Sequence, residues 1–367
     1  MKREKPPTIV DVAAEAGVSI ATVSNVINRR KVPMSPETVR RVEEAIARLG
    51  YRRNVMATNL SRRRSHELGL ILPHFGGYYG RFAEKLEQKV HGYGYHLSVF
   101  SAAGMDPEIE QRHLEHLLQR RVDGLVSHGL AMSIPSTMQL AGEGTPLVIF
   151  NGWNWPGDVV KWAVNLDFAG ASREAAGYLL ARGCRTVVYA GRRHGMGANE
   201  QRIAGFLAGV AEHGTEVAHA LLDAGELGVA GVLEAALSVG GSAPSGPVGI
   251  YTFNDALALE LLAECHERGI RVPDEVQLIG MDNEPFAKAA FPSLTSFEMP
   301  VDLQTSLVAA FLIKQLGEEL DEADEALLEQ YLAQTVGHEL LIPMAMVVRK
   351  STKGGRGDDG AGGFAEL

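Results

Sequence analysis

Four polar residues, far apart in the sequence, lie where a short apolar run gives way to the pattern of a helix. Asn151 follows PLVIF, Asn254 follows VGIYTF, Asp282 follows VQLIGM, and Arg202 lies in NEQRIAGF at the start of a helix. A guanidinium can donate to two adjacent hydroxyl groups, and a carboxylate can accept from a pair of them. Residues of these types at the same end of four separate strand–helix units are therefore candidate ligand contacts.

Each of these residues also has a structural interpretation. Asn254 can simply cap the helix that follows it, because a short polar side chain accepts from the first free backbone N–H groups. Arg202 and Asp282 can pair with each other across the cleft. For these two residues we favour ligand contact, and for Asn254 both interpretations stay open.

All three tryptophans fall within ten positions of the stretch NGWNWPGDVVKW. A tryptophan face can stack on the apolar face of a sugar ring, but tryptophan is also common in cores and at subunit contacts. Trp153 and Trp155 are therefore interpreted equally as walls of a ligand site or as packing residues.

Signals of catalysis and metal binding are weak. The stretch GRRHGMG at 191–197 lacks the glycine order and acidic partner of a dinucleotide site, so we interpret it as a cleft loop. His113 and His116 have no third ligand at metal spacing, which favours a solvated helix face over a zinc site. Cys184 and Cys265 are isolated and are expected to be reduced and buried. We therefore expect neither an enzyme nor a bound metal or cofactor.

From Leu68 onward, short apolar runs alternate with amphipathic helices, which is typical of parallel sheets covered on both faces. Two successive series suggest two similar halves with a cleft at the carboxyl ends of the strands. The expected strands are 68–72, 95–100, 123–128, 146–150, about 162–164, 186–190, about 216–222, 248–251 and 276–280. The expected helices are 80–94, 107–120, 134–144, 169–182, 199–213, one ending at 237, and 255–268.

The stretch from Thr8 to Asn28 has a different pattern: two short helices with a tight turn between them. Thr8 can cap the first helix, Gly17 can end it in the left-handed conformation, and Ser19 can cap the second. A second helix with short exposed side chains is typical of a helix-turn-helix, whose second helix enters the major groove of DNA. The side chains expected on that exposed face are Ile20, Ala21, Thr22, Ser24 and Asn25.

A third helix is expected from Ser35, its cap, to Gly50, where it ends. Residues 1–64 hold 14 lysines and arginines against 6 acidic residues, a net charge of +8, whereas the rest of the chain has a net charge of −18. A basic head on an acidic body indicates that the head binds a phosphate backbone.

The motif DVAAEAGVSIATVSNVIN, followed by PETVRRVEEAIARLGY, resembles the lac repressor/galactose repressor (LacI/GalR) family of bacterial transcriptional regulators. The resemblance continues to about Thr352. It implies an all-α head joined to an α/β core of two similar parallel-sheet subdomains, like a periplasmic binding protein. The DNA-binding positions that it implies are Thr8, Ser19, Ile20, Ala21, Thr22, Ser24, Asn25, Asn28, Asn54, Ala57 and Leu60.

Among these positions, Ile20, Ala21 and Asn25 match the family's base-reading residues. Asn25 stands where many relatives carry arginine. Asparagine favours adenine as its target, whereas arginine would favour guanine. In the family, the segment after Tyr51 is a hinge helix that enters the minor groove. Leu60 matches the residue that wedges between base steps and Ala57 matches the close-packed small residue.

In the core, the family positions that match Arg202, Asn254 and Asp282 contact a small effector, usually a sugar. The resemblance also suggests contact by Tyr78 and Tyr79, although tyrosine is common at interfaces as well. The full set expected to bind the effector is Tyr79, Asn151, Trp153, Arg202, Asn254 and Asp282.

We therefore divide the chain into a DNA-binding domain at 1–52, a hinge at 53–64, an effector-binding and dimerisation domain at 65–352, and a disordered tail at 353–367. The chain should cross between the two halves of the core near 163, 292 and 330. The tail lacks the leucine heptads that make some relatives tetramers, so a homodimer is expected.

No 18-residue apolar run and no signal-peptide core is present, so the protein is expected in the cytoplasm, at the nucleoid, without a membrane partner. These features predict a ligand-responsive regulator, expected to be a repressor, that binds a pseudo-palindromic operator as a dimer and is switched by a small metabolite, a sugar by family habit. The alternative is an α/β sugar- or nucleotide-processing enzyme with an accessory DNA-binding head.

Overall fold

A computed structural model provides the structure of the chain, which separates into two compact units, Met1–Ser65 and His66–Leu367. The structure describes residues 7–27, 33–51, 64–102, 108–109, 112–113, 115–116, 122–142, 144–192, 197–214, 217–239, 241, 246–333, 335 and 337–354. The predicted hinge helix, including Asn54, Ala57 and Leu60, lies outside these residues, as does Asn28.

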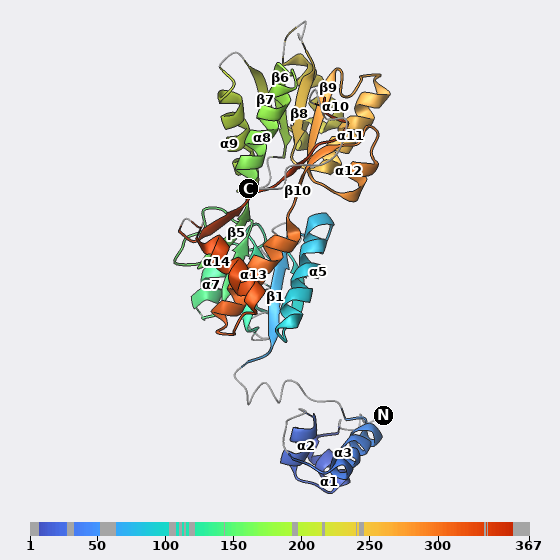
Figure 1. Ribbon diagram of the computed structural model, residues 1–367, viewed down its shortest axis with the longest axis vertical. Helices are drawn as coiled ribbons and strands as arrows, with labels where there is room; N and C mark the ends of the chain where they lie inside the picture. The colour runs from blue at the N-terminus through green and yellow to red at the C-terminus, as the bar shows by residue number, and fades with distance from the viewer. Residues whose placement is uncertain are drawn as a thin grey trace. The chain divides into compact units, whose positions relative to one another are not determined.

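The first unit contains α1 (Ile9–Ala16), α2 (Ile20–Ile27) and α3 (Pro36–Leu49) (Figure 1). Thr8 and Asp11 form a capping box, in which the Thr8 Oγ1 accepts from the Asp11 N–H and the Asp11 carboxylate accepts from the Thr8 N–H. Gly17 ends α1 with φ 65°, a conformation that costs glycine little. The predicted Thr8 cap and Gly17 stop are therefore confirmed, and Ser35 and Gly50 bound α3 as predicted.

The three helices enclose a small core of their own. Its buried members are Val12, Ala13, Ala16, Val23, Val42 and Ala45. The apolar stripe predicted for α1 faces this core, and α2 contributes Val23. The side of α2 that carries Ile20 and Ala21 remains exposed.

Among the described residues no single helix is long and apolar enough to span a membrane. Helices α1 and α2 reach that length and composition only as a pair bent by 104°.

The second unit contains two six-stranded sheets (Figure 1). The first has the order β11-β5-β4-β3-β1-β2 and is entirely parallel. Its strands are β1 (Glu67–Leu72), β2 (His96–Ser101), β3 (Gly124–His128), β4 (Leu147–Phe150), β5 (Trp162–Leu166) and β11 (Glu339–Ile342). The second has the order β12-β10-β9-β8-β6-β7, and only its β12–β10 pair is antiparallel. Its strands are β6 (Thr186–Gly191), β7 (Ala218–Asp223), β8 (Val248–Thr252), β9 (Val276–Asp282), β10 (Thr295–Glu298) and β12 (Met346–Val347).

Helices pack on both sheets, as the alternating pattern predicts. Those of the first half are α5 (Gly77–Gly92), α7 (Ile134–Gly142), α13 (Val301–Gln315) and α14 (Glu322–Leu332). Those of the second half are α8 (Phe168–Ala181), α9 (Ala198–Ala211), α10 (Ala224–Ser238), α11 (Asp255–Glu267) and α12 (Pro285–Ala289). Helices α8 and α9 pack closely because Gly205 and Gly209 of α9 have no Cβ. A Cβ at either position would clash with the backbone of α8. The α/β core of two similar subdomains is thus confirmed.

The chain passes between the two halves three times, as expected, but later than the expected positions. It leaves the first sheet after Leu166, returns between Glu298 and Val301, and leaves again between Ile342 and Met346. The expected crossings at 163, 292 and 330 lie within β5, before β10 and within α14. The first crossing comes later because β5 must complete its pairing in the first sheet before the chain can leave it. The third comes later because α14 packs on α13 in the first half instead of crossing.

The end of the core also lies further along the chain than expected. The predicted tail begins at 353, but the Lys353 N–H donates to the Gln277 side chain over 2.9 Å. The structure describes the chain to Gly354, and 355–367 lie outside the described residues.

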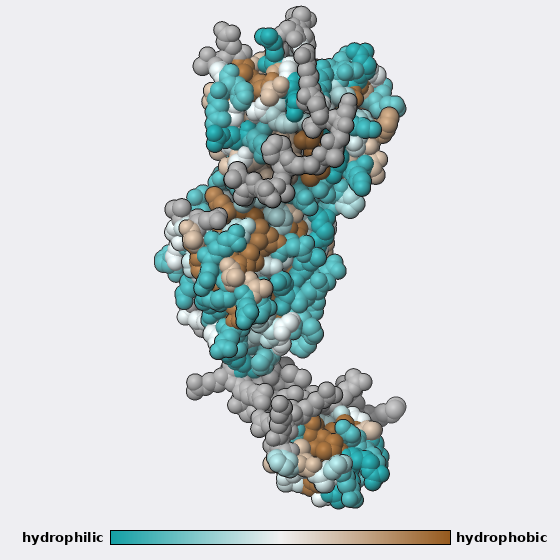
Figure 2. Space-filling view, viewed as in Figure 1, coloured by the Kyte–Doolittle hydropathy of each residue, from teal (hydrophilic) through white to brown (hydrophobic). Residues whose placement is uncertain are grey.

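In the space-filling view, hydrophilic residues cover most of the visible surface of the second unit, and a hydrophobic area lies over its first half (Figure 2).

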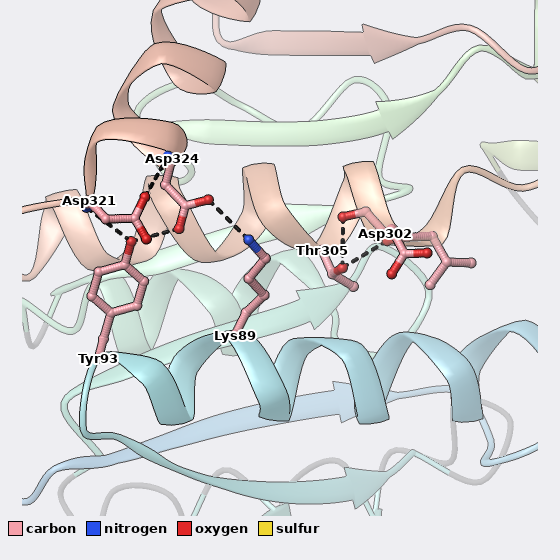
Figure 3. A network of polar contacts seen from close by, with 7 residues as sticks. Lys89, Tyr93, Asp302, Thr305, Asp321 and Asp324 are labelled. Atoms are coloured by element: carbon pink, nitrogen blue, oxygen red, sulfur yellow. Dashed lines mark hydrogen bonds and ion pairs between the residues drawn. The ribbon is translucent and has the colours of Figure 1, made fainter.

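A polar network joins α14 to the end of α5 (Figure 3). The buried Asp324 carboxylate accepts from the Lys89 Nζ at 3.1 Å and from the Tyr93 hydroxyl at 2.6 Å. The Tyr93 hydroxyl in turn accepts from the Asp321 N–H, and Asp321 caps α14. The pKa of Tyr93 is raised by burial and by its hydrogen bond to Asp324. The buried carboxylate of Asp324 therefore joins α14 to the C-terminal end of α5.

Replacing this carboxylate should destabilise the core. Asp324→Ala leaves a hydroxyl and an ammonium group without their acceptor, which should lower the free energy of unfolding by about 1–3 kcal/mol. Urea unfolding followed by tryptophan fluorescence measures this, because all three tryptophans lie in the second unit. The control is Glu325→Ala, which breaks a 2.6 Å ion pair with Lys314 that is more exposed to solvent and should cost about 0–1 kcal/mol. Equal losses in the two variants would contradict the role given to Asp324.

Candidate functional site

A cavity of about 550 Å³ lies between the two halves of the second unit, at the carboxyl ends of their strands. The first half contributes His74, Tyr79, His128 and Asn151. The second half contributes Arg192, Arg202, Phe253, Asn254, Asp282 and Glu284. Five of the six residues that the sequence predicts for effector binding therefore line one cavity, because parallel strands bring their carboxyl ends to the same edge.

Arg202 lies in α9, one turn from its start, and only 8% of it is exposed. Its guanidinium lies over the Phe168 ring, 3.8 Å from the ring centre, and donates to the Met281 sulfur at 3.3 Å. Its Nε is buried without a hydrogen-bond partner. Because a thioether sulfur is a weak acceptor, much of the donor capacity of this guanidinium is left for a molecule in the cavity.

Asp282 ends β9 in the left-handed region, with φ 105°. Burial raises the pKa of its carboxyl to about 8, against the opposing effect of Arg202. Among the described residues no ion pair within 4.0 Å joins Asp282 to Arg202. The structural alternative raised for these two residues, a pair across the cleft, is therefore wrong.

Asn254 serves as a helix cap and also lines the cavity. Its Oδ1 accepts from the Leu257 N–H at 3.0 Å, which confirms the capping interpretation. Its position in the cavity wall leaves the amide Nδ2 as the group that can donate to a ligand.

Asn151 belongs to a buried hydrogen-bond network. Its Nδ2 donates to the Tyr78 hydroxyl at 3.1 Å, and its Oδ1 accepts from the Gln304 Nε2 at 3.0 Å and from the Leu166 N–H at 3.2 Å. The Tyr78 hydroxyl donates to the Gln304 Oε1. The side chain of Asn151 therefore shapes the cavity wall, with its Oδ1 and one of its two Nδ2 hydrogens already in use.

Tyr79 lies between two histidines that sequence reasoning did not identify. It makes edge contacts with His74 and His128, with ring centres 4.6 and 5.1 Å apart. The His128 Nδ1 accepts from the Leu130 N–H, which leaves its Nε2 as the protonated nitrogen, 3.4 Å from the Tyr79 hydroxyl. Burial, with a smaller effect from His74, lowers the pKa of His128 to about 3, so it stays neutral. A single histidine at the end of a strand gives no sequence signal for such a role.

Trp153 does not line the cavity, which corrects the prediction of a ligand wall. It is 8% exposed and packs against Phe168, with ring centres 5.4 Å apart. Phe168, which lines the cavity, contacts both the Trp153 ring and the Arg202 guanidinium, so the tryptophan supports a residue of the site. Trp155 belongs to a separate cluster on the other face of the first sheet. The packing interpretation applies to both tryptophans.

Two further charged residues of the cavity wall were not predicted. Arg192, the first residue after β6, lies over the Phe253 ring with its guanidinium 5.4 Å from the ring centre. Glu284 accepts from Arg81 of α5 at 2.6 Å, and this ion pair joins the second half to the first. Arg81 and Glu284 are 203 positions apart, so only the fold shows that they meet.

The described residues contain no group of three or more His, Cys, Asp and Glu side chains that could hold a metal ion. His113 does not lie on a solvated face as expected. It is partly buried and hydrogen-bonds through Nε2 to the Ser101 carbonyl at 2.7 Å. His116 is exposed.

In the first unit, α2 has the exposed side expected of a recognition helix. Ile20 is 48% exposed, Ala21 is exposed, and Asn25 is partly buried. The Ser19 Oγ accepts from the Thr22 N–H at 3.1 Å, so Ser19 holds the first turn of this helix. Thr8, a predicted DNA contact, is exposed although its side chain takes part in the capping box.

Comparison with known proteins assigns both units. Residues 8–54 match the model of the bacterial regulatory proteins of the lacI family, and residues 176–352 match that of a periplasmic binding protein-like domain. Catabolite control protein A of Staphylococcus aureus (strain N315) is 30% identical over 322 residues, which cover 88% of this chain and 96% of that protein. The chain belongs to the LacI family of bacterial regulatory proteins. The catabolite control protein A of Staphylococcus xylosus is also 30% identical, over 86% of this chain and 94% of its own length.

Solved structures of LacI-family proteins have the same fold. The complex of the transcriptional regulator CelR with cellobiose has a TM-score of 0.63 and 25% identity, and the match covers 94% of this chain and 99% of that one. The lac repressor dimer bound to operator and the anti-inducer ONPF has a TM-score of 0.71 and 22% identity, over 95% and 99% of the two chains. This LacI-family chain therefore matches these two solved chains over nearly their whole length.

Proposed function

We propose that this LacI-family regulator binds a pseudo-palindromic operator as a homodimer and is switched, as a repressor, by a small metabolite in the cavity of its second unit. The observation that carries the proposal is the buried guanidinium of Arg202, which lines that cavity and forms no ion pair within the described part of the chain. CelR was solved with cellobiose and the lac repressor dimer with operator. These complexes support a sugar or sugar derivative as effector, and duplex DNA as partner of the head.

DNA binding is proposed to use α2 in the major groove, with Ile20, Ala21 and Asn25 at the base edges. The proposed hinge, with Ala57 and Leu60, would enter the minor groove. Effector binding would alter the closure of the core and thereby the geometry of the two hinges in the dimer. A coupling of about 1–3 kcal/mol is enough for such a switch.

Matched truncations test the head. A random duplex pool yields the preferred operator, and fluorescence anisotropy measures affinity for it as a function of salt. Asn25→Ala should lose about 1–3 kcal/mol of discrimination at one base pair of each half-site, because its amide can no longer bond an adenine edge. Ile20→Ala should weaken binding by a similar amount if it contacts a thymine methyl group.

The control is Val10→Ala, which truncates another exposed apolar residue of the head, 55% exposed and on α1. It should leave the selected sequence unchanged. Binding that does not weaken with salt, or equal effects of Val10→Ala and Ile20→Ala, would contradict the proposed recognition helix.

A further inference from the structure

The wall that the second half gives to the cavity carries two arginines. Arg192 and Arg202 each lie over an aromatic ring, Phe253 and Phe168. None of the ion pairs of the described residues involves either arginine. Guanidinium groups that stack on rings keep the N–H groups of their edges free for an acceptor.

The positive end of α9 lies at the same wall. Gly197 is the N-cap of this helix and has no side chain to cap it, and Ala198 and Asn199 of the first turn line the cavity. The first N–H groups of a helix have no acceptor within the helix, and its dipole favours a negative group at that end. Arg202, more than nine-tenths buried and with an unpartnered Nε, lies on the same helix one turn further on.

The acidic residues of the cavity do not balance this wall. Glu284 is already paired with Arg81, as shown by their 2.6 Å contact. Asp282 is then the remaining carboxyl among the described residues of the wall. Burial keeps its pKa near 8, so it is largely protonated at neutral pH. The described residues of the cavity wall thus carry an excess of positive charge.

We propose that the effector is anionic, and that its carboxylate or phosphate group binds between Arg192 and the first turn of α9, within reach of Arg202. Hydroxyl groups of the same molecule would bond to Asn254 and Asp282, which line the same cavity. The cavity volume of about 550 Å³ suits a molecule of mono- or disaccharide size. This inference rests on the proposed function, because it names the chemical class of the effector for the same cavity.

Matched pairs of probes test the inference on the full-length protein. Thermal shift and titration calorimetry compare D-glucose with D-glucuronate, D-gluconate and D-glucose 6-phosphate, and inorganic phosphate with chloride at equal ionic strength. Each anionic sugar should bind at least about tenfold more tightly than D-glucose, because a charged hydrogen bond is stronger than a neutral one, and phosphate should stabilise the protein more than chloride does. The carboxylate and phosphate arms distinguish the two sources of charge.

Arg192→Gln should reduce the affinity for the anionic probes by about 10- to 100-fold and leave any affinity for D-glucose unchanged. The matched control is Arg271→Gln, which removes a side chain that is 69% exposed and pairs only with neighbours on the surface. If the parent and Arg192→Gln respond equally to every anion, the inference is wrong. If neutral sugars bind best and Arg202→Met abolishes this, the inference is wrong but the proposed effector site stands. If no probe depends on Arg202, both fail.

Discussion

Replacing Arg202 with methionine should abolish the response to effector while the protein still binds its operator. Methionine keeps the packing on Phe168 and Met281 but removes the buried donors that face the cavity. Two charged hydrogen bonds lost to a ligand, at about 1.5–3 kcal/mol each, correspond to roughly 100- to 10,000-fold in affinity. Calorimetry on the full-length protein measures the loss, and operator release by effector, followed by anisotropy, reports the response.

The same substitution distinguishes a binding role from a structural one. The unpartnered Nε of Arg202 is costly to bury, so Arg202→Met should leave the melting temperature unchanged or raise it. Arg202→Lys keeps the charge but not the planar donor fork, and should bind effector with intermediate affinity. A lower melting temperature together with lost operator binding would show instead that Arg202 holds the fold.

Much of the site followed from the sequence because a parallel α/β fold collects the residues that follow its strands. Asn151, Asn254 and Asp282 each come directly after an apolar run, and that position alone places them at the carboxyl edge. Sequence reasoning could not decide which of their polar atoms remain free. Asn151 uses its amide in a network with Tyr78 and Gln304, whereas Asp282 forms no ion pair with any described residue.

The missed residues depend on contacts between distant segments. Glu284 is held by Arg81 from the other half, and His128 acquires its role only beside Tyr79. Trp153 shows the converse limit, because an aromatic residue near a cleft can form its wall or support it. Here Phe168 takes the inner position and the tryptophan lies behind it. The crossings were placed too early because apolar periodicity shows where a strand lies but not in which sheet it pairs.

The binding of an anionic effector should weaken as the pH rises above 8. Burial raises the pKa of Asp282 to about 8, Arg202 and Arg81 oppose this shift, and Asp255 and Glu284 add to it. A bound anion repels the ionised carboxylate and neutralises the effect of Arg202, so it should raise this pKa further. When the bound state has the higher pKa, binding favours the protonated form, and affinity is constant below pH 8 and falls up to about tenfold per pH unit above it.

Calorimetry between pH 6.5 and 9.5 measures this slope, with the sugar acid that binds most tightly, because its own carboxylate stays ionised over that range. Asp282→Asn keeps the size of the side chain but is neutral at every pH, so its profile should be flat above pH 8. Asp274→Asn, which changes an exposed carboxylate, should retain the slope of the parent. An affinity that rises with pH toward 8 would mean that the ionised carboxylate accepts from hydroxyl groups with no anion nearby. The sign of this slope therefore tests the charge of the effector independently of Arg192.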